Sequence, residues 1–210
     1  MRSGRLMVVV ALIAATTIWI DDRVSEPSLT AFDPARMGRL EASMWRSYYE
    51  HAWPSLVCDG LRVSCGEYGL SWWDGVRGAV LAAQAAYYFR SDTNHPRCPI
   101  LLERYYTIIR SATGRDFDTA EAARLELEWW QMRRRKVDPA EYGETIADNL
   151  ALVYGLETAA LLPASVMRAE AMHYRDHHGR SGEMTEESWA EVARRLESAY
   201  AALRVAATAH

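Results

Sequence analysis

The chain has 210 residues, 50% hydrophobic and 25% charged, a composition that suits one globular domain and excludes a disordered or low-complexity protein. Its 24 Lys and Arg against 28 Asp and Glu give a net charge of −4, which provides no overall positive field for nucleic acid. The 8 Trp and 11 Tyr outnumber the 3 Phe, and the polar tips of Trp and Tyr suit protein interfaces and membrane boundaries.

Residues 1–21 have the pattern of a signal anchor. Two arginines precede an uncharged stretch from Leu6 to Ile20, and an acidic pair follows it. Because Ala14 and Thr16 form a poor cleavage site and the apolar run continues through Trp19, we predict a retained transmembrane helix rather than a cleaved export signal. The stretch is nevertheless shorter than the ~20 residues of a typical span. The predicted anchor residues are Leu6, Val9, Leu12, Ile13 and Trp19.

The charges that flank this stretch predict the side of the membrane on which the domain lies. Arginines before the helix and acids after it place the N-terminus inside and the domain on the periplasmic, extracytoplasmic side. Residues 22–32 are polar, contain Pro27 and lack periodicity, so they predict a linker between the membrane and a domain over residues 33–210.

Hydrophobic residues recur with helical spacing along the whole domain, and none of its segments has the alternation of a strand. Asp33-Pro34 and Asp138-Pro139 each place a capping residue before proline at the first helical position, while Gly114 and Gly155 follow periodic segments. We predict an all-α fold in which the membrane helix precedes one domain of seven or eight packed helices. The segments are 34–51, a helix from Pro54 past Leu61 to Cys65, then 72–89, 100–112, 119–135, 139–154, 156–178 on both sides of Pro163, and a last helix after Thr185; residues 91–99 are a loop.

The three cysteines exclude a zinc site of the usual spacing, because the chain has no C-x-x-C motif. Cys58 and Cys65 lie two turns apart on one predicted helix, about 10 Å, which is too far for a disulfide. Either one can instead pair with Cys98, or all three are small buried hydrophobic residues.

Several carboxylates lie inside or near the apolar stripes of the predicted helices. Glu170 and His173 form a Glu-x-x-His pair, which resembles the metal-binding motif of ferritin-like di-metal carboxylate proteins. The resemblance is partial, because Tyr106 stands where a second histidine would follow Glu103. It implies a di-iron or di-manganese enzyme or storage bundle with the ligands Glu41, Glu103, Glu126, Glu170 and His173.

The same carboxylates have a second interpretation that needs no metal. Glu41 lies in the apolar stripe of the first domain helix, where an ionised group requires a partner, and arginine is abundant in the chain. We therefore predict that an arginine from another helix, rather than a metal ion, holds Glu41. The chain also lacks the common hydrolase, kinase and dinucleotide-binding motifs, so no complete catalytic signature is present.

Pairs of adjacent aromatic residues recur along the predicted helices. Neighbouring positions diverge by about 100° on a helix, so one ring of each pair can face the core while the other lies near its edge. We therefore predict an interface for another protein at Trp72, Trp73, Trp129 and Trp130.

Short motifs around Leu40-Glu41, from Leu102 to Tyr106 and from Leu125 to Trp130 are loosely similar to uncharacterised bacterial exported or membrane-anchored helical proteins. The resemblance spans most of the domain and implies no activity. The sequence favours a non-catalytic, membrane-anchored accessory subunit that packs against a larger membrane protein complex. A photosynthetic or respiratory complex is one natural host, and the di-metal bundle is the alternative.

Overall fold

The structure is a computed structural model that describes residues 26–180, 182 and 184–209. These residues form eight α-helices and one π-helical turn, with no β-strand among them, and so confirm an all-α fold. The elements are α2 (Pro34–Tyr49), α3 (Trp53–Leu61), η1 (Arg62–Glu67), α4 (Trp72–Ser91), α5 (Arg97–Thr113), α6 (Thr119–Arg134), α7 (Pro139–Tyr154), α8 (Thr158–Arg180) and α9 (Glu186–Thr208).

The predicted anchor over residues 1–21 lies outside the described residues. In the part of the chain that the structure describes, no helix has both the length and the apolar character that a membrane crossing requires.

The helix boundaries follow from local capping chemistry. Asp33 Oδ1 accepts the backbone N–H of Arg36 at 2.7 Å, and Asp118 and Asp138 cap α6 and α7 in the same way. At the other ends, Gly114 and Gly155 close α5 and α7 with φ of +65° and +64°, a conformation that costs glycine little. The aspartates and glycines therefore begin and end these helices where the sequence predicts.

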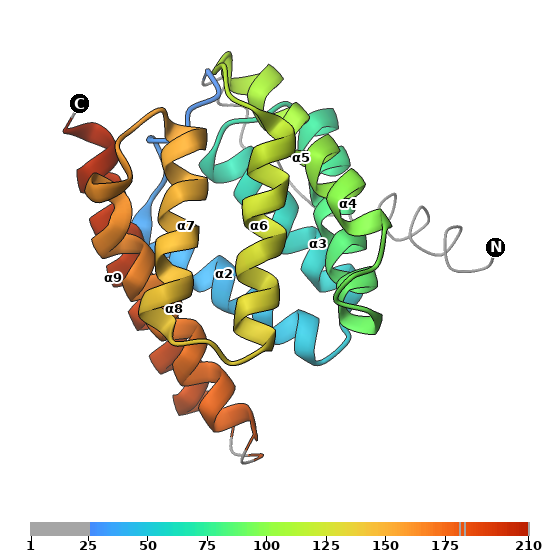
Figure 1. Cartoon of the computed structure of the whole chain (residues 1–210), viewed down its shortest axis with the longest axis vertical. Helices are drawn as coiled ribbons and strands as arrows, with labels where there is room; N and C mark the ends of the chain where they lie inside the picture. Colours follow the sequence, from blue (N-terminus) through green and yellow to red (C-terminus); the bar gives the residue numbers. More distant parts are fainter. Residues whose placement is uncertain (1–25, 181, 183, 210) are drawn as a thin grey trace.

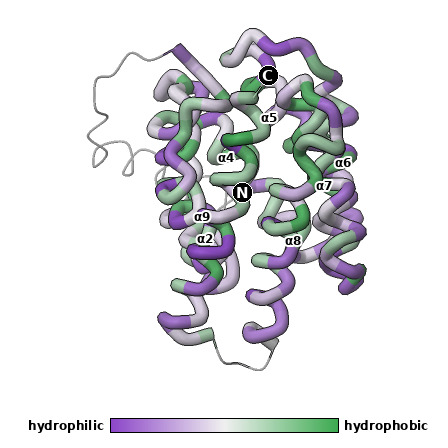
Figure 2. Tube along the Cα trace, turned by 90° about the vertical axis from the view of Figure 1, so that its left-hand side faces the viewer, coloured by the Kyte–Doolittle hydropathy of each residue, from purple (hydrophilic) through white to green (hydrophobic). Residues whose placement is uncertain are grey.

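Each helix packs against the next one along the chain, and α9 packs against α2, so the helices form a closed ring (Figure 1). Short connections make consecutive helices antiparallel. The first described residues and the end of α9 therefore lie at one end of the ring, and the end of α8 and the start of α9 lie at the other. Figure 2 shows hydrophobic and hydrophilic residues alternating along the helix traces, as expected for helices with one buried face.

The predicted linker is wrong where the structure describes it, because residues 26–32 belong to the domain. Leu29 and Phe32 are 4% and 0% exposed, and the Phe32 ring packs edge-on against the rings of Tyr68 and Tyr200. The Tyr154 hydroxyl donates to the carbonyl of Leu29 at 3.0 Å. These contacts close one end of the ring, so this segment is packed core rather than a spacer.

Two segments depart from the predicted helix boundaries. The predicted loop over residues 91–99 is shorter, since α5 begins at Arg97 and holds Pro99 in its first turn, where the missing N–H costs no hydrogen bond. The helix predicted from Pro54 to Cys65 continues as the π-helical turn η1, in which Tyr68 N–H bonds to Val63 O at 3.1 Å, five residues back. All three cysteines are free thiols.

Candidate functional site

A buried ion pair crosses the interior of the ring. Glu41 on α2 is 3% exposed, and Arg168 on α8 donates from Nε to both of its carboxylate oxygens at 3.0 and 3.2 Å. The Tyr200 hydroxyl donates to the same carboxylate at 2.7 Å. Burial alone would lower the pKa of Arg168, but the Glu41 carboxylate outweighs burial and raises that pKa well above its ordinary value. The predicted partnership of Glu41 with an arginine from another helix is confirmed.

A second carboxylate, that of the half-buried Glu126 on α6, accepts hydrogen bonds from uncharged groups of the described residues. The indole N–H groups of Trp129 and Trp130 donate to it, each at 3.0 Å. The Tyr106 hydroxyl lies 3.0 Å from Glu126 Oε2 and 3.1 Å from Asn149 Oδ1. These bonds satisfy the carboxylate of Glu126 with donors from the protein itself.

The two carboxylates belong to one network, because Arg168 also lies over the Trp129 ring at 5.3 Å from its centroid. Burial and the Glu41 carboxylate raise the pKa of Tyr200, and burial and the Glu126 carboxylate raise the pKa of Tyr106. Both tyrosines therefore stay protonated and act as donors. The network therefore joins α2, α8 and α9 around Glu41 with α5, α6 and α7 around Glu126.

The five residues predicted for a di-metal centre do not form one site. Glu41 and Glu126 are engaged in the network, whereas Glu103, Glu170 and His173 are exposed. Glu170 and His173 do share a helical face, but that face points outward, because Ala169 and Met172 occupy the buried face of α8. Among the described residues, no three His, Cys, Asp or Glu side chains gather in a way that could hold a metal ion.

The four predicted interface tryptophans have different environments. Trp73 is 70% exposed at the start of α4, and Trp72 and Trp130 are half-buried. The assignment of Trp129 to an interface is wrong, because this side chain is 5% exposed and lies between the Glu126 carboxylate and the Arg168 guanidinium. In the first pair, one ring is exposed and the other is half-buried, which agrees with the 100° divergence of neighbouring helix positions. In the second pair, neither ring is exposed.

Trp73 lies at the end of the ring where the described chain begins. The backbone N–H of Ser28 donates to the carbonyl of Tyr68 at 2.9 Å, and Tyr68 lies five residues before Trp73 in the chain. Val205, in the last turns of α9, is also 70% exposed and belongs to the same end. Trp73 and Val205 are the two most exposed large hydrophobic residues of the described chain.

The opposite end of the ring is rich in arginine and aromatic rings. Arg133, in the last turn of α6, is mostly buried and donates to Asp176 on α8 at 2.8 and 3.0 Å. Arg175 adds a further bond to Asp176 at 3.0 Å, and Tyr49 lies beneath its guanidinium. Burial would raise the pKa of Asp176, but the two guanidinium groups hold it below its ordinary value.

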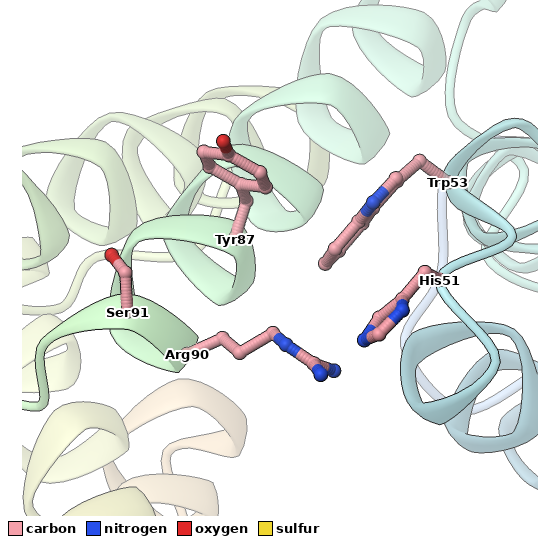
Figure 3. A pocket seen from close by; sticks show the side chains of 5 residues that line it. All are labelled: His51, Trp53, Tyr87, Arg90 and Ser91. Atoms are coloured by element: carbon pink, nitrogen blue, oxygen red, sulfur yellow. The ribbon is translucent and has the colours of Figure 1, made fainter.

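The same end carries an open pocket of about 340 Å³ lined by His51, Trp53, Tyr87, Arg90 and Ser91 (Figure 3). The aromatic pairs at 48–49 and 87–88 are visible in the sequence, but the juxtaposition of the α2–α3 connection with the end of α4 is tertiary. Sequence reasoning therefore missed this site.

Comparison of the chain with protein-family models, with curated proteins and with solved structures finds no match.

Proposed function

We propose that this protein is a non-catalytic, membrane-anchored accessory subunit whose helical domain packs against a larger membrane protein complex through the end that carries Trp73. The observation that carries the proposal is the 70% exposure of the Trp73 side chain. An exposed ring of this size is costly to hydrate, and tryptophan is among the residues that contribute most to protein–protein contacts.

The position of Trp73 supports a partner at the membrane. The predicted anchor precedes the first described residues, and these residues pack at the same end of the ring as Trp73. A tether at that point would hold this end toward the bilayer and toward a membrane-embedded host. A photosynthetic or respiratory complex is one host of this kind.

The interior supports a structural rather than a catalytic role. Two of the carboxylates predicted as metal ligands accept hydrogen bonds from the protein itself. The buried Glu41 accepts from Arg168 and Tyr200, and the half-buried Glu126 accepts from two indoles and a hydroxyl. The hydrogen bonds of Glu41 link α2 with α8 and α9, and that of Tyr106 links α5 with α6, which stabilises the domain as a body for docking.

Site-specific photo-crosslinking in native membranes tests this proposal. A photoreactive amino acid in place of Trp73 is expected to crosslink to a membrane protein, and the same group at Ile100 is the control, since Ile100 is 51% exposed at the opposite end. Crosslinks from both positions alike, crosslinks to lipid alone, or release of the chain from membranes by alkaline washing would overturn the proposal.

A further inference from the structure

The pocket at the end opposite to Trp73 combines one cation with flat aromatic walls. His51 and Trp53 come from the connection between α2 and α3, and Tyr87, Arg90 and Ser91 come from the last turns of α4. In Figure 3 the Arg90 guanidinium and the rings of His51 and Trp53 point toward one another across the open space, and Tyr87 stands beside them.

Arg90 supplies a positive charge that no carboxylate of the described chain neutralises. Its contacts within the described residues are a long bond of 3.4 Å to the carbonyl of Tyr48 and a position over the Tyr48 ring. Glu50, which precedes His51 in the chain, pairs with Arg46 at 2.8 Å. The guanidinium therefore keeps donors for an anion, and its planar fork matches a carboxylate.

The aromatic walls are held in place before any ligand arrives. Trp53 packs edge-on against Tyr87 with ring centroids 5.4 Å apart and against Tyr48 at 6.0 Å. The His51 ring lies nearly parallel to the Trp53 ring, with an angle of 17° between their planes. Such fixed, flat surfaces suit a planar ring, and preorganisation reduces the entropic cost of binding it.

His51 occupies a position that normally favours glycine. The N–H of Ala52 donates to Ser47 O at 2.8 Å, and the N–H of His51 donates to Tyr48 O. These two bonds are typical of a helix C-terminus that is followed by a residue in the left-handed conformation. His51 adopts this conformation with φ of +61°. A side chain kept at such a position carries a conformational cost, and here that side chain lines the pocket.

We propose that this pocket binds a small carboxylate with a single aromatic ring, its carboxylate on Arg90 and its ring against Trp53, Tyr87 and His51. The volume of about 340 Å³ is at the lower end of ligand pockets, which fits one ring and a short acidic arm. The proposal is independent of docking at Trp73, since the two surfaces lie at opposite ends of the ring.

Three probes separate charge from shape in calorimetric titrations of the purified full-length protein. Phenylacetate is expected to bind in the millimolar range, and phenylacetamide, with the same shape and no charge, about tenfold more weakly, as expected when a charged hydrogen bond is lost. Acetate, with the charge and no ring, should bind more weakly than phenylacetate by a similar factor. Equal affinity for the acid and the amide, or no binding of phenylacetate, would overturn the proposal.

Two matched pairs of variants locate the binding. Arg90→Gln is expected to weaken phenylacetate binding about tenfold. Arg97→Gln should leave binding unchanged, although Arg97 also lies over a tyrosine ring, that of Tyr88 at 5.2 Å. A loss of binding in Arg97→Gln, or none in Arg90→Gln, contradicts the site.

The second pair uses the left-handed positions. His51→Gly is expected to raise the melting temperature, because glycine adopts the left-handed conformation without strain. It should also weaken binding of phenylacetate, because it removes one wall of the pocket. Lys136→Gly, at the equivalent position after α6 with φ of +63°, should raise the melting temperature without changing binding. If His51→Gly binds phenylacetate as the wild type does, His51 is not part of the site and the proposal fails in that respect.

Discussion

Arg168 on α8 and Glu41 on α2 are partners across the ring rather than along it. The helices are not neighbours in the ring, since α9 lies between them in the circuit, yet Arg168 Nε donates to Glu41 Oε1 at 3.0 Å. The pair thus joins the two helices that flank α9, and Tyr200 on α9 donates to the same carboxylate. Such a centre specifies one arrangement of three helices, because any other leaves a buried charge without its partner.

Glu41→Gln is therefore expected to lower the free energy of unfolding by about 3–5 kcal/mol, because it leaves the Arg168 guanidinium buried without a counter-charge. Urea denaturation measures the change. Glu197→Gln is the control, since Glu197 pairs with Arg39 at an exposed site and should cost less than about 1 kcal/mol. Equal losses would contradict the argument, and loss of bound iron or manganese with unchanged stability would return Glu41 to the di-metal interpretation.

Gly38 marks the close approach of α2 to α9, and replacing it tests that approach. A Cβ at Gly38 would lie 2.8 Å from the backbone Cα of Glu197, so Gly38→Ala must separate the two helices and should destabilise the domain by about 1–3 kcal/mol. At Gly78 the nearest atoms are 3.7 Å away, in the Tyr105 ring. Gly78→Ala should therefore stabilise α4 by about 0.5–1 kcal/mol, as alanine does within helices. Thermal melts of both variants give the signs, and a shared sign would refute the packing.

The Asp176 cluster should make the domain sensitive to acid. The pKa of Asp176 lies below its ordinary value, because Arg133 and Arg175 outweigh the effect of burial. Stability from this group is present above the unfolded pKa of about 4 and is lost as the pH falls through the lower folded pKa.

Asp176→Asn should accordingly lower the free energy of unfolding at neutral pH by about 2 kcal/mol, and with it the melting temperature. The decline of the melting temperature below a pH of about 4 should also be less steep in this variant. Asp116→Asn, which removes one negative charge from an exposed position, is the control. Parallel pH profiles for the wild type and Asp176→Asn would show that Arg133 and Arg175 do not govern this decline.

Most of the fold follows from signals that are local in the sequence. Asp33, Asp118 and Asp138 begin helices, and Gly114 and Gly155 end them, because capping depends on residues within one turn. The segment around Leu29 shows the limit. Its polarity predicts a linker, whereas the burial of Leu29 depends on contacts with residues more than a hundred positions away, such as Tyr154.

The sites were less accessible to prediction than the fold. The partner of Glu41 could be predicted as an arginine, since a buried carboxylate requires one, but its identity as Arg168 depends on how the ring closes. The Glu170 and His173 pair has the right spacing for a ligand pair, and spacing alone does not say whether that face is inside. The pocket at His51 brings together two segments that no local pattern connects.

Trp73 and Trp129 give the last prediction, because the same residue type has opposite environments at the two positions. Trp129→Ala removes a side chain that is 5% exposed, together with its bond to Glu126 and its contact with Arg168, and should cost about 3–5 kcal/mol in the free energy of unfolding. Trp73→Ala removes a ring that is 70% exposed and touches chiefly the Trp72 ring, so its cost should stay below about 1 kcal/mol. Urea denaturation of the two variants, each compared with the wild type, measures both values. A cost for Trp73→Ala as large as that for Trp129→Ala would mean that the Trp73 ring packs within the domain, and the docking surface at that end would lose its main residue.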